Sequence, residues 1–211
     1  MIQVRESYQV KFGKIDQAVE HFMRFPGSRS GDGSYEVLTD LSGEMYTLVT
    51  GLHVDSLAAW EEIQAGLARG KDVQEWFRPF KQHVEDGVRE FNTVEQENGG
   101  WSRAGAIVVR SCFRALEWRM AETVDLLKTY GAMLVDSGVG ARPRILSDAS
   151  GRMFNTVIEI ETPDLRTWDE HRRNLFRDPQ FEVWFLRLVG CVSHGSHTFY
   201  TVAGQTGRAT S

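Results

Sequence analysis

Residues 38–60 read LTDLSGEMYTLVTGLHVDSLAAW, and residues 146–168 read LSDASGRMFNTVIEIETPDLRTW. The two stretches belong to a longer match, in which residues 38–95 align with residues 146–203 at a constant offset of 108 and 18 of 58 positions are identical. Unrelated sequences match at only about one position in twenty. The beginnings of the halves also align, at an offset of 105. The chain is therefore a tandem duplication of a unit of roughly 100 residues.

The bulk composition excludes several classes of protein. The 211 residues carry a formal net charge of −5, whereas nucleic-acid binding requires clustered Lys and Arg. No run of 18 apolar residues is present, so we expect no membrane-spanning helix. The N-terminus is charged and alternating, unlike a signal peptide, and Cys112 and Cys191 occupy non-equivalent repeat positions. We expect a cytoplasmic protein with reduced thiols that binds neither nucleic acid nor membrane.

Each half has the same predicted order of elements. An alternating segment, at residues 2–10 and 107–115, predicts a first strand. A helix with apolar residues three and four positions apart follows. Two strands joined by a Ser-Gly turn come next, at residues 35–40 and 44–53 in the first half and at 144–148 and 152–161 in the second. A helical region in two pieces and a last strand, at residues 89–94 and 197–202, complete each half. In the second half, Thr162 is the expected cap of the first helical piece, with Pro163 at the first helical position. The order β-α-β-β-α-β is that of the ferredoxin-like split βαβ unit.

The domain boundaries follow from the duplication. We predict a first ferredoxin-like repeat at residues 1–95, a polar linker at 96–105, a second repeat at 106–203 and a flexible tail at 204–211. In one such unit, helices cover one face of the sheet and the other face is left exposed. Two units in one chain can cover these exposed faces by packing sheet against sheet. The predicted fold class is therefore α+β, with two tandem ferredoxin-like βαββαβ repeats forming an intramolecular dimeric α+β barrel.

Short motifs in both halves carry a resemblance to a known family. They are Arg5-Glu6-Ser7-Tyr8 with Gly13-Lys14 in the first half, and Thr162-Pro163-Asp164-Leu165, Trp168, Asp178-Pro179-Gln180-Phe181 and Trp184 in the second. With these motifs the chain resembles the dimeric α+β barrel superfamily and, within it, the NIPSNAP-like proteins. That superfamily includes cofactor-free monooxygenases of aromatic polyketides, haem-degrading enzymes, haem-binding dehydratases and proteins with no assigned activity. The resemblance implies the fold and leaves the function open.

Strand alternation predicts which side chains lie on the sheet face opposite the helices. That face mixes Met and Val with Arg, Asn, Glu and Thr, a combination typical of small-molecule sites. The expected ligand-binding residues of the two halves are Ser7, Met45, Thr47 and His53, and Met153 and Asn155.

Three side chains on that face are candidates for catalysis. Arg5 and Arg110 could clamp a carboxylate, enolate or phenolate; alternatively, each pairs with a nearby acid such as Glu36 or Glu159. Glu159 replaces Gly51 of the first half, and a carboxylate in an apolar cavity could act as general base or acid. The alternative for Glu159 is a salt bridge to Arg110.

The histidines predict no metal site. None of the six recurs at an equivalent repeat position, and His194 and His197 have no apparent third ligand. His171 follows Trp168 on a predicted helix and could ligate haem, the one cofactor that the sequence leaves open. Four tryptophans at helical spacing are expected to anchor the helix–sheet interface: Trp60, Trp76, Trp168 and Trp184.

These patterns predict a cytosolic small-molecule-binding α+β barrel protein for an apolar or aromatic metabolite, of the kind found in secondary metabolism. As an enzyme it would be a cofactor-independent oxygenase or cyclase, in which a base removes a proton and an arginine stabilises the enolate or phenolate. Two alternatives stay open at this point. One is a non-catalytic binding or assembly protein of NIPSNAP type, able to form homo-oligomers; the other is a haem-binding protein.

Overall fold

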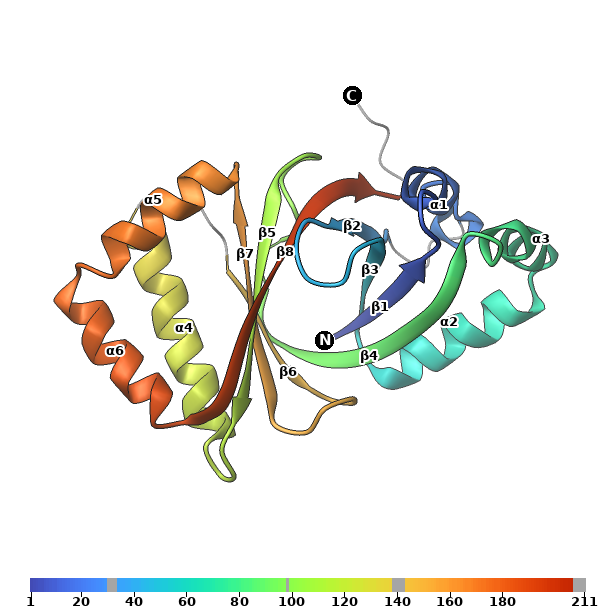
Figure 1. Ribbon diagram of the computed structural model, residues 1–211. Coiled ribbons are helices and arrows are strands. Elements are labelled where there is room, and N and C mark those ends of the chain that lie inside the picture. The colour runs from blue at the N-terminus through green and yellow to red at the C-terminus, as the bar shows by residue number, and fades with distance from the viewer. Residues whose placement is uncertain (30–33, 98, 138–142, 207–211) are drawn as a thin grey trace. The chain divides into compact units, whose positions relative to one another are not determined.

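The structure is a computed structural model, and it describes residues 1–29, 34–97, 99–137 and 143–206 (Figure 1). The chain divides into two compact units, one containing Met1–Asn92 with the segment from Thr201 onward, the other containing Thr93–Tyr200. Within the described part of the chain, no helix combines the length and the apolar character needed to cross a bilayer.

The first unit is an antiparallel sheet with helices on one side. β3 pairs with β1 on one side and with β2 on the other, and Figure 1 shows helices packed along these strands. Its elements are β1 (Ile2–Val10), α1 (Ile15–Phe22), a short 3-10 helix (Pro26–Arg29), β2 (Glu36–Asp40), β3 (Thr47–Val54), α2 (Leu57–Arg69), α3 (Lys71–Phe80) and β4 (Val84–Gln96).

The second unit repeats this arrangement. β7 pairs with β5 and with β6, and three helices again cover one side of the strands (Figure 1). Its elements are β5 (Ile107–Ala115), α4 (Met120–Asp136), β6 (Arg144–Asp148), β7 (Asn155–Thr162), α5 (Leu165–Leu175), α6 (Pro179–Val189) and β8 (Val192–Gln205).

The element order confirms the predicted α+β class with two ferredoxin-like βαββαβ repeats. Within the second unit, β8 hydrogen-bonds to β5. β4 and β8 are longer than the sequence predicts, and each continues past a boundary between the units. β8 runs to Gln205, and the Thr206 amide donates to the Tyr35 carbonyl at 2.9 Å. The segment predicted as a tail from residue 204 therefore begins within a strand.

The strand that follows each Ser-Gly turn begins three residues later than the sequence predicts. Tyr46 and Phe154 have φ values of 60° and 64°, so the backbone is left-handed there and the strand starts only afterwards. The Phe154 amide donates to Asp148 Oδ2 at 3.2 Å, which closes the second turn. Met45 and Met153 consequently lie in the turns and are 70% and 66% exposed. Placing them in strands was wrong.

The helix α5 has a different cap from the one predicted. Asp164, not Thr162, caps it, because the Asp164 carboxylate accepts a hydrogen bond from the Thr167 amide at 2.7 Å. Pro163 therefore lies before the helix. The next helix, α6, does begin with a proline, Pro179, after the cap residue Asp178.

The face assignment from strand alternation is correct in both units. Val4, Leu48 and Leu52 are buried against the helices of the first unit. Val109, Ile158 and Ile160 do the same in the second. Burial of such side chains contributes about 1.5–3 kcal/mol each and holds the helices on the sheet. The second core also contains Trp168 and Trp184, as the sequence predicts.

Candidate functional site

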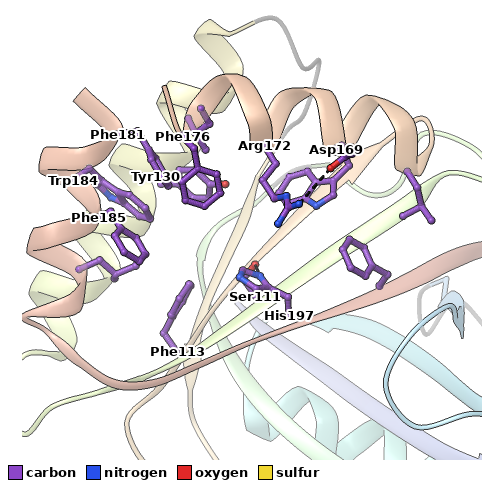
Figure 2. Close-up of a pocket in the computed structure, with 15 residues that line it drawn as sticks. Ser111, Phe113, Tyr130, Asp169, Arg172, Phe176, Phe181, Trp184, Phe185 and His197 are labelled. Atoms are coloured by element: carbon purple, nitrogen blue, oxygen red, sulfur yellow. Dashed lines mark hydrogen bonds and ion pairs between the residues drawn. The ribbon is translucent and has the colours of Figure 1, made fainter. Parts of the chain in front are cut away.

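A cavity of about 510 Å³ lies in the second unit between the sheet and the helices α4, α5 and α6 (Figure 2). Its volume is in the range of small-molecule sites. Eight of its fifteen lining residues are Phe, Tyr or Trp, and only four are polar. The polar residues are Ser111, Asp169, Arg172 and His197. An aromatic cavity with a few polar groups suits a largely apolar ring system.

The helices hold the aromatic wall in a fixed geometry. Phe181, Trp184 and Phe185 lie three and four residues apart on α6, so their rings share one helix face. Trp184 Nε1 donates to the Leu126 carbonyl of α4 at 2.7 Å. The Tyr130 ring, also from α4, stacks on Trp184 with centroids 4.6 Å apart. These contacts set the ring orientations before any ligand enters.

Two neighbouring strands supply a serine–histidine pair on the floor of the cavity. Ser111 Oγ of β5 lies 2.7 Å from His197 Nδ1 of β8, and Figure 2 shows the two side chains together. Burial lowers the pKa of His197, and the positive charge of Arg172 lowers it further. His197 is therefore a neutral imidazole at neutral pH. In the tautomer that donates from Nδ1 to Ser111, Nε2 presents a lone pair to the cavity.

Arg172 brings a cation close to this pair. It extends from α5 toward Ser111 and His197, as Figure 2 shows. One turn earlier, Asp169 Oδ1 lies 3.4 Å from the Arg172 guanidinium, and both side chains are about half exposed. This surface pair is weak, so the guanidinium keeps hydrogen-bond donors for a ligand. The cavity thus combines a neutral base with a cation.

Two of the predicted catalytic residues lie on the opposite face of the same sheet. Arg110 and Glu159 occupy directly paired positions on β5 and β7 and form a buried ion pair. Glu159 also lies 3.3 Å from Arg144 of β6, which is fully buried and stacks on Trp101 at 4.5 Å. The salt-bridge alternative for Arg110 and Glu159 is thus what the structure contains. Arg144 was missed, although it stands at the start of a predicted strand.

The third predicted catalytic residue, Arg5, lies in the first unit. Its guanidinium donates to Ser7 Oγ at 2.5 Å and lies 3.5 Å from Glu90. The structure therefore brings together Arg5 and the predicted ligand-binding residue Ser7. Thr47 and His53 stand near opposite ends of β3, and Thr47 Oγ1 donates to the carbonyl of Glu44 in the turn at 2.8 Å.

The first unit has a cavity at the equivalent place, but its polar groups differ. This space of about 450 Å³ is lined by Glu6 and Arg89, which are the repeat equivalents of Ser111 and His197. Arg89 Nε donates to Glu6 at 2.6 Å, and the Tyr8 hydroxyl donates to the same carboxylate at 2.5 Å. Both carboxylate oxygens of Glu6 are thus engaged. The Glu6–Arg89 pair therefore has no basic atom left for a ligand. In the equivalent Ser111–His197 pair, His197 can present a basic nitrogen to its cavity.

Sequence reasoning missed Ser111 and His197 as site residues. The sequence does contain an indication of Ser111. Alternation places residue 111, like Val109 and Phe113, on the side of the strand that faces the helices. A polar residue in that row interrupts a face that otherwise contributes to the core. The same position in the first half is Glu6, which is also polar.

Comparison with known proteins identifies the architecture. No family model and no curated protein matches this chain. Among solved structures, an anthrone oxidase-like protein matches 98% of this chain and 94% of its own length, with TM-score 0.68 and 15% identity. A putative monooxygenase from Fusobacterium nucleatum matches 99% of this chain and 94% of its own, with TM-score 0.73 and 9% identity. At these identities the two matches show a shared fold.

Other solved structures match with lower scores. A haem-binding protein from Thermus thermophilus matches 95% of this chain and 90% of its own length, with TM-score 0.56 and 13% identity. Solved NIPSNAP proteins also match, each over less than half of this chain. The matches with TM-scores above 0.5 confirm the predicted fold, and at these identities they do not carry a function over to this chain.

Proposed function

We propose that this dimeric α+β barrel protein is a cofactor-independent enzyme that binds an apolar aromatic metabolite in the cavity of the second unit. The observation that carries the proposal is the hydrogen bond between Ser111 and His197 on the floor of an aromatic cavity of substrate size. The proposed mechanism has the same two roles as the mechanism predicted from the sequence: a base removes a proton, and an arginine stabilises the anion. In this proposal His197 is the base and Arg172 is the arginine.

His197 is the proposed general base. Its neutral state at neutral pH and its contact with the cavity allow Nε2 to take a proton from an acidic carbon or phenol of the substrate. Ser111 positions the ring through Nδ1 and stabilises the imidazolium that forms, as an orienting group does for a catalytic histidine. Ser111 is therefore a positioning residue.

Arg172 is the proposed stabiliser of the negative charge. When the C–H or O–H bond breaks, its electron pair is delocalised onto an oxygen of the ring system. A guanidinium can donate two parallel hydrogen bonds to such an oxyanion. Because Arg172 also lowers the pKa of His197, one cation both keeps the base unprotonated and receives the charge that the base creates.

The step after deprotonation would follow from the reactivity of the carbanion. An anthrone illustrates the oxygenase case, and the anthrone oxidase-like structural match supports its choice as a probe. Its anion adds to dioxygen to give a peroxide, and loss of water yields the anthraquinone. One dioxygen is consumed and one water is released, so the overall reaction needs no further oxidant.

The proposal is tested by incubating the purified protein with an anthrone under air. We expect anthraquinone formation above the spontaneous rate, followed by absorbance and by dioxygen uptake, and quenching of fluorescence from Trp168 and Trp184 on binding. Quenching without turnover would support the non-catalytic binding alternative. A Soret band on haem titration that is lost in His171→Ala, the ligand predicted from the sequence, or in His197→Ala would favour the haem alternative instead.

The pH dependence of turnover follows from the state of His197. Burial and Arg172 hold its pKa below the ordinary 6.5, and only the neutral ring can accept a proton. We therefore expect kcat/KM to fall as the pH drops, with the midpoint of this acidic limb below 6.5. In Arg172→Gln the charge that lowers the pKa is gone, so the limb should move to higher pH. A limb that stays in place or moves to lower pH in this variant would contradict the assignment.

A further inference from the structure

A second hollow, of about 480 Å³, lies on the sheet face that points away from the helices of the second unit. Met153 and Asn155, both predicted ligand-binding residues, help to line it. Arg114 of β5 and Arg152 of the turn before β7 contribute guanidinium groups, and His194 of β8 contributes an imidazole. No acidic residue is found among the described residues around this hollow.

The two guanidiniums differ from those of Arg110, Arg144 and Arg119 in the same unit. Arg110 and Arg144 are paired with Glu159, and Arg119 is paired with Glu122. In contrast, the side chains of Arg114 and Arg152 form neither an ion pair nor a hydrogen bond with any residue in the described part of the chain. Both side chains are exposed, and two positive charges that line one hollow attract an anion. The arrangement is unexpected in a chain with a net charge of −5.

The strand register directs the polar groups to one side of the sheet. Arg114 and Asn155 are directly paired on β5 and β7. His194 and Ser196 are two residues apart on β8, so they share a face that is opposite to that of His197. Ser193 Oγ donates to the Arg114 carbonyl at 3.3 Å, which places the start of β8 beside the end of β5. Three strands therefore supply hydrogen-bond donors to one space.

The first repeat shows that the fold does not require this positive charge. The repeat equivalents of Arg114 and Arg152 are Gln9 and Glu44, and that of His194 is Asp86. The Ser-Gly-x-Met turn is kept in both halves, while the first half has a neutral residue and two acidic residues at these three positions. The difference between the repeats thus lies in the groups that would contact a ligand.

We propose that this hollow is a binding site for a compact dianion, a phosphate monoester or a dicarboxylate, held between Arg114 and Arg152. Each guanidinium offers a pair of parallel N–H donors, a geometry that matches both phosphate and carboxylate oxygens. The Asn155 amide and the Ser196 hydroxyl supply further donors. The site lies across the sheet from the aromatic cavity, because Ser196 and His197 are consecutive residues on opposite faces of β8. It is therefore separate from the proposed catalytic site.

The test is isothermal titration calorimetry of the full chain with inorganic phosphate and, separately, with succinate. We expect at least one of the two to bind, with the affinity lowered about tenfold or more in Arg114→Gln and in Arg152→Gln, and lowered by added NaCl. Arg78→Gln is the matched control, because Arg78 is an exposed arginine on α3 of the other unit; it should bind like the unaltered protein.

The pattern of binding identifies the class of ligand. Binding of phosphate alone indicates a phosphate monoester, and binding of succinate alone indicates a dicarboxylate. The melting temperature without anion provides a second measurement, and it should not fall in either arginine variant, since neither guanidinium has a partner to lose among the described residues. Failure of both anions to bind, or binding that neither variant weakens, would overturn the proposal.

Discussion

Substituting glutamine for His197 should lower kcat/KM for the anthrone probe by about 10²–10³-fold while the protein stays folded. The loss corresponds to the usual contribution of one general base. Glutamine keeps a polar side chain near Ser111, but its amide cannot accept a proton at neutral pH. Steady-state kinetics of anthraquinone formation measure the effect. Circular dichroism and a melting curve establish that the variant has the same fold.

A matched histidine provides the control for this experiment. His83 is also a histidine whose pKa is lowered by burial, but it lies in the first unit, outside the cavity. His83→Gln should leave kcat/KM within about twofold, because it alters neither the base nor its orienting group. Ser111→Ala should give an intermediate loss and a shifted pH profile, as expected for a positioning residue. Near-normal turnover in His197→Gln would remove His197 from the mechanism.

The second large effect is on stability, and it concerns Glu159. This carboxylate is flanked by Arg110 on one neighbouring strand and by Arg144 on the other. Its side chain is 3% exposed, and those of the two arginines are 5% and 0% exposed. Glu159→Ala removes the shared carboxylate and weakens the compensation of two buried cations. We expect the free energy of unfolding to fall by about 3–5 kcal/mol, measured by urea denaturation.

The same variant distinguishes a structural role for Glu159 from a catalytic one. Glu117→Ala removes the same charge from an exposed position and should change the unfolding free energy by no more than about 0.5 kcal/mol. If Glu159 were a general base, its replacement would abolish turnover with little loss of stability. A change in unfolding free energy below about 1 kcal/mol for Glu159→Ala would contradict the buried-network account.

Much of the fold could be predicted because its signals are local and occur twice. The alternation over residues 2–10 and 107–115 matches β1 and β5. The errors occur where local signals are misleading. Tyr46 and Phe154 have left-handed backbone conformations, so the following strands begin only after them. The sequence does not show this, because aromatic residues are typical of strands and their φ angle cannot be inferred from residue type. The polar beginnings of β4 and β8 show no alternation of apolar residues, so these strands were predicted too short.

The candidate site was less predictable because it depends on contacts between distant residues. The pairing of Arg110 with Glu159 could be anticipated, since the two strands are neighbours within one repeat. Ser111 and His197 are 86 residues apart, and their contact depends on the pairing of β5 with β8. These are the first and last strands of one repeat, and neither strand's own pattern indicates that these two side chains meet. The sequence therefore did not bring these two residues together.

The most direct test of the proposed cavity is a crystal structure of the protein soaked with an anthrone or its anthraquinone product. The account predicts ring density between Trp168 and Trp184, with a ligand oxygen within hydrogen-bond distance of Arg172 and a ring carbon or hydroxyl beside His197 Nε2. Ligand density beside Arg110 and Glu159 on the other sheet face, with the aromatic cavity empty, would contradict it.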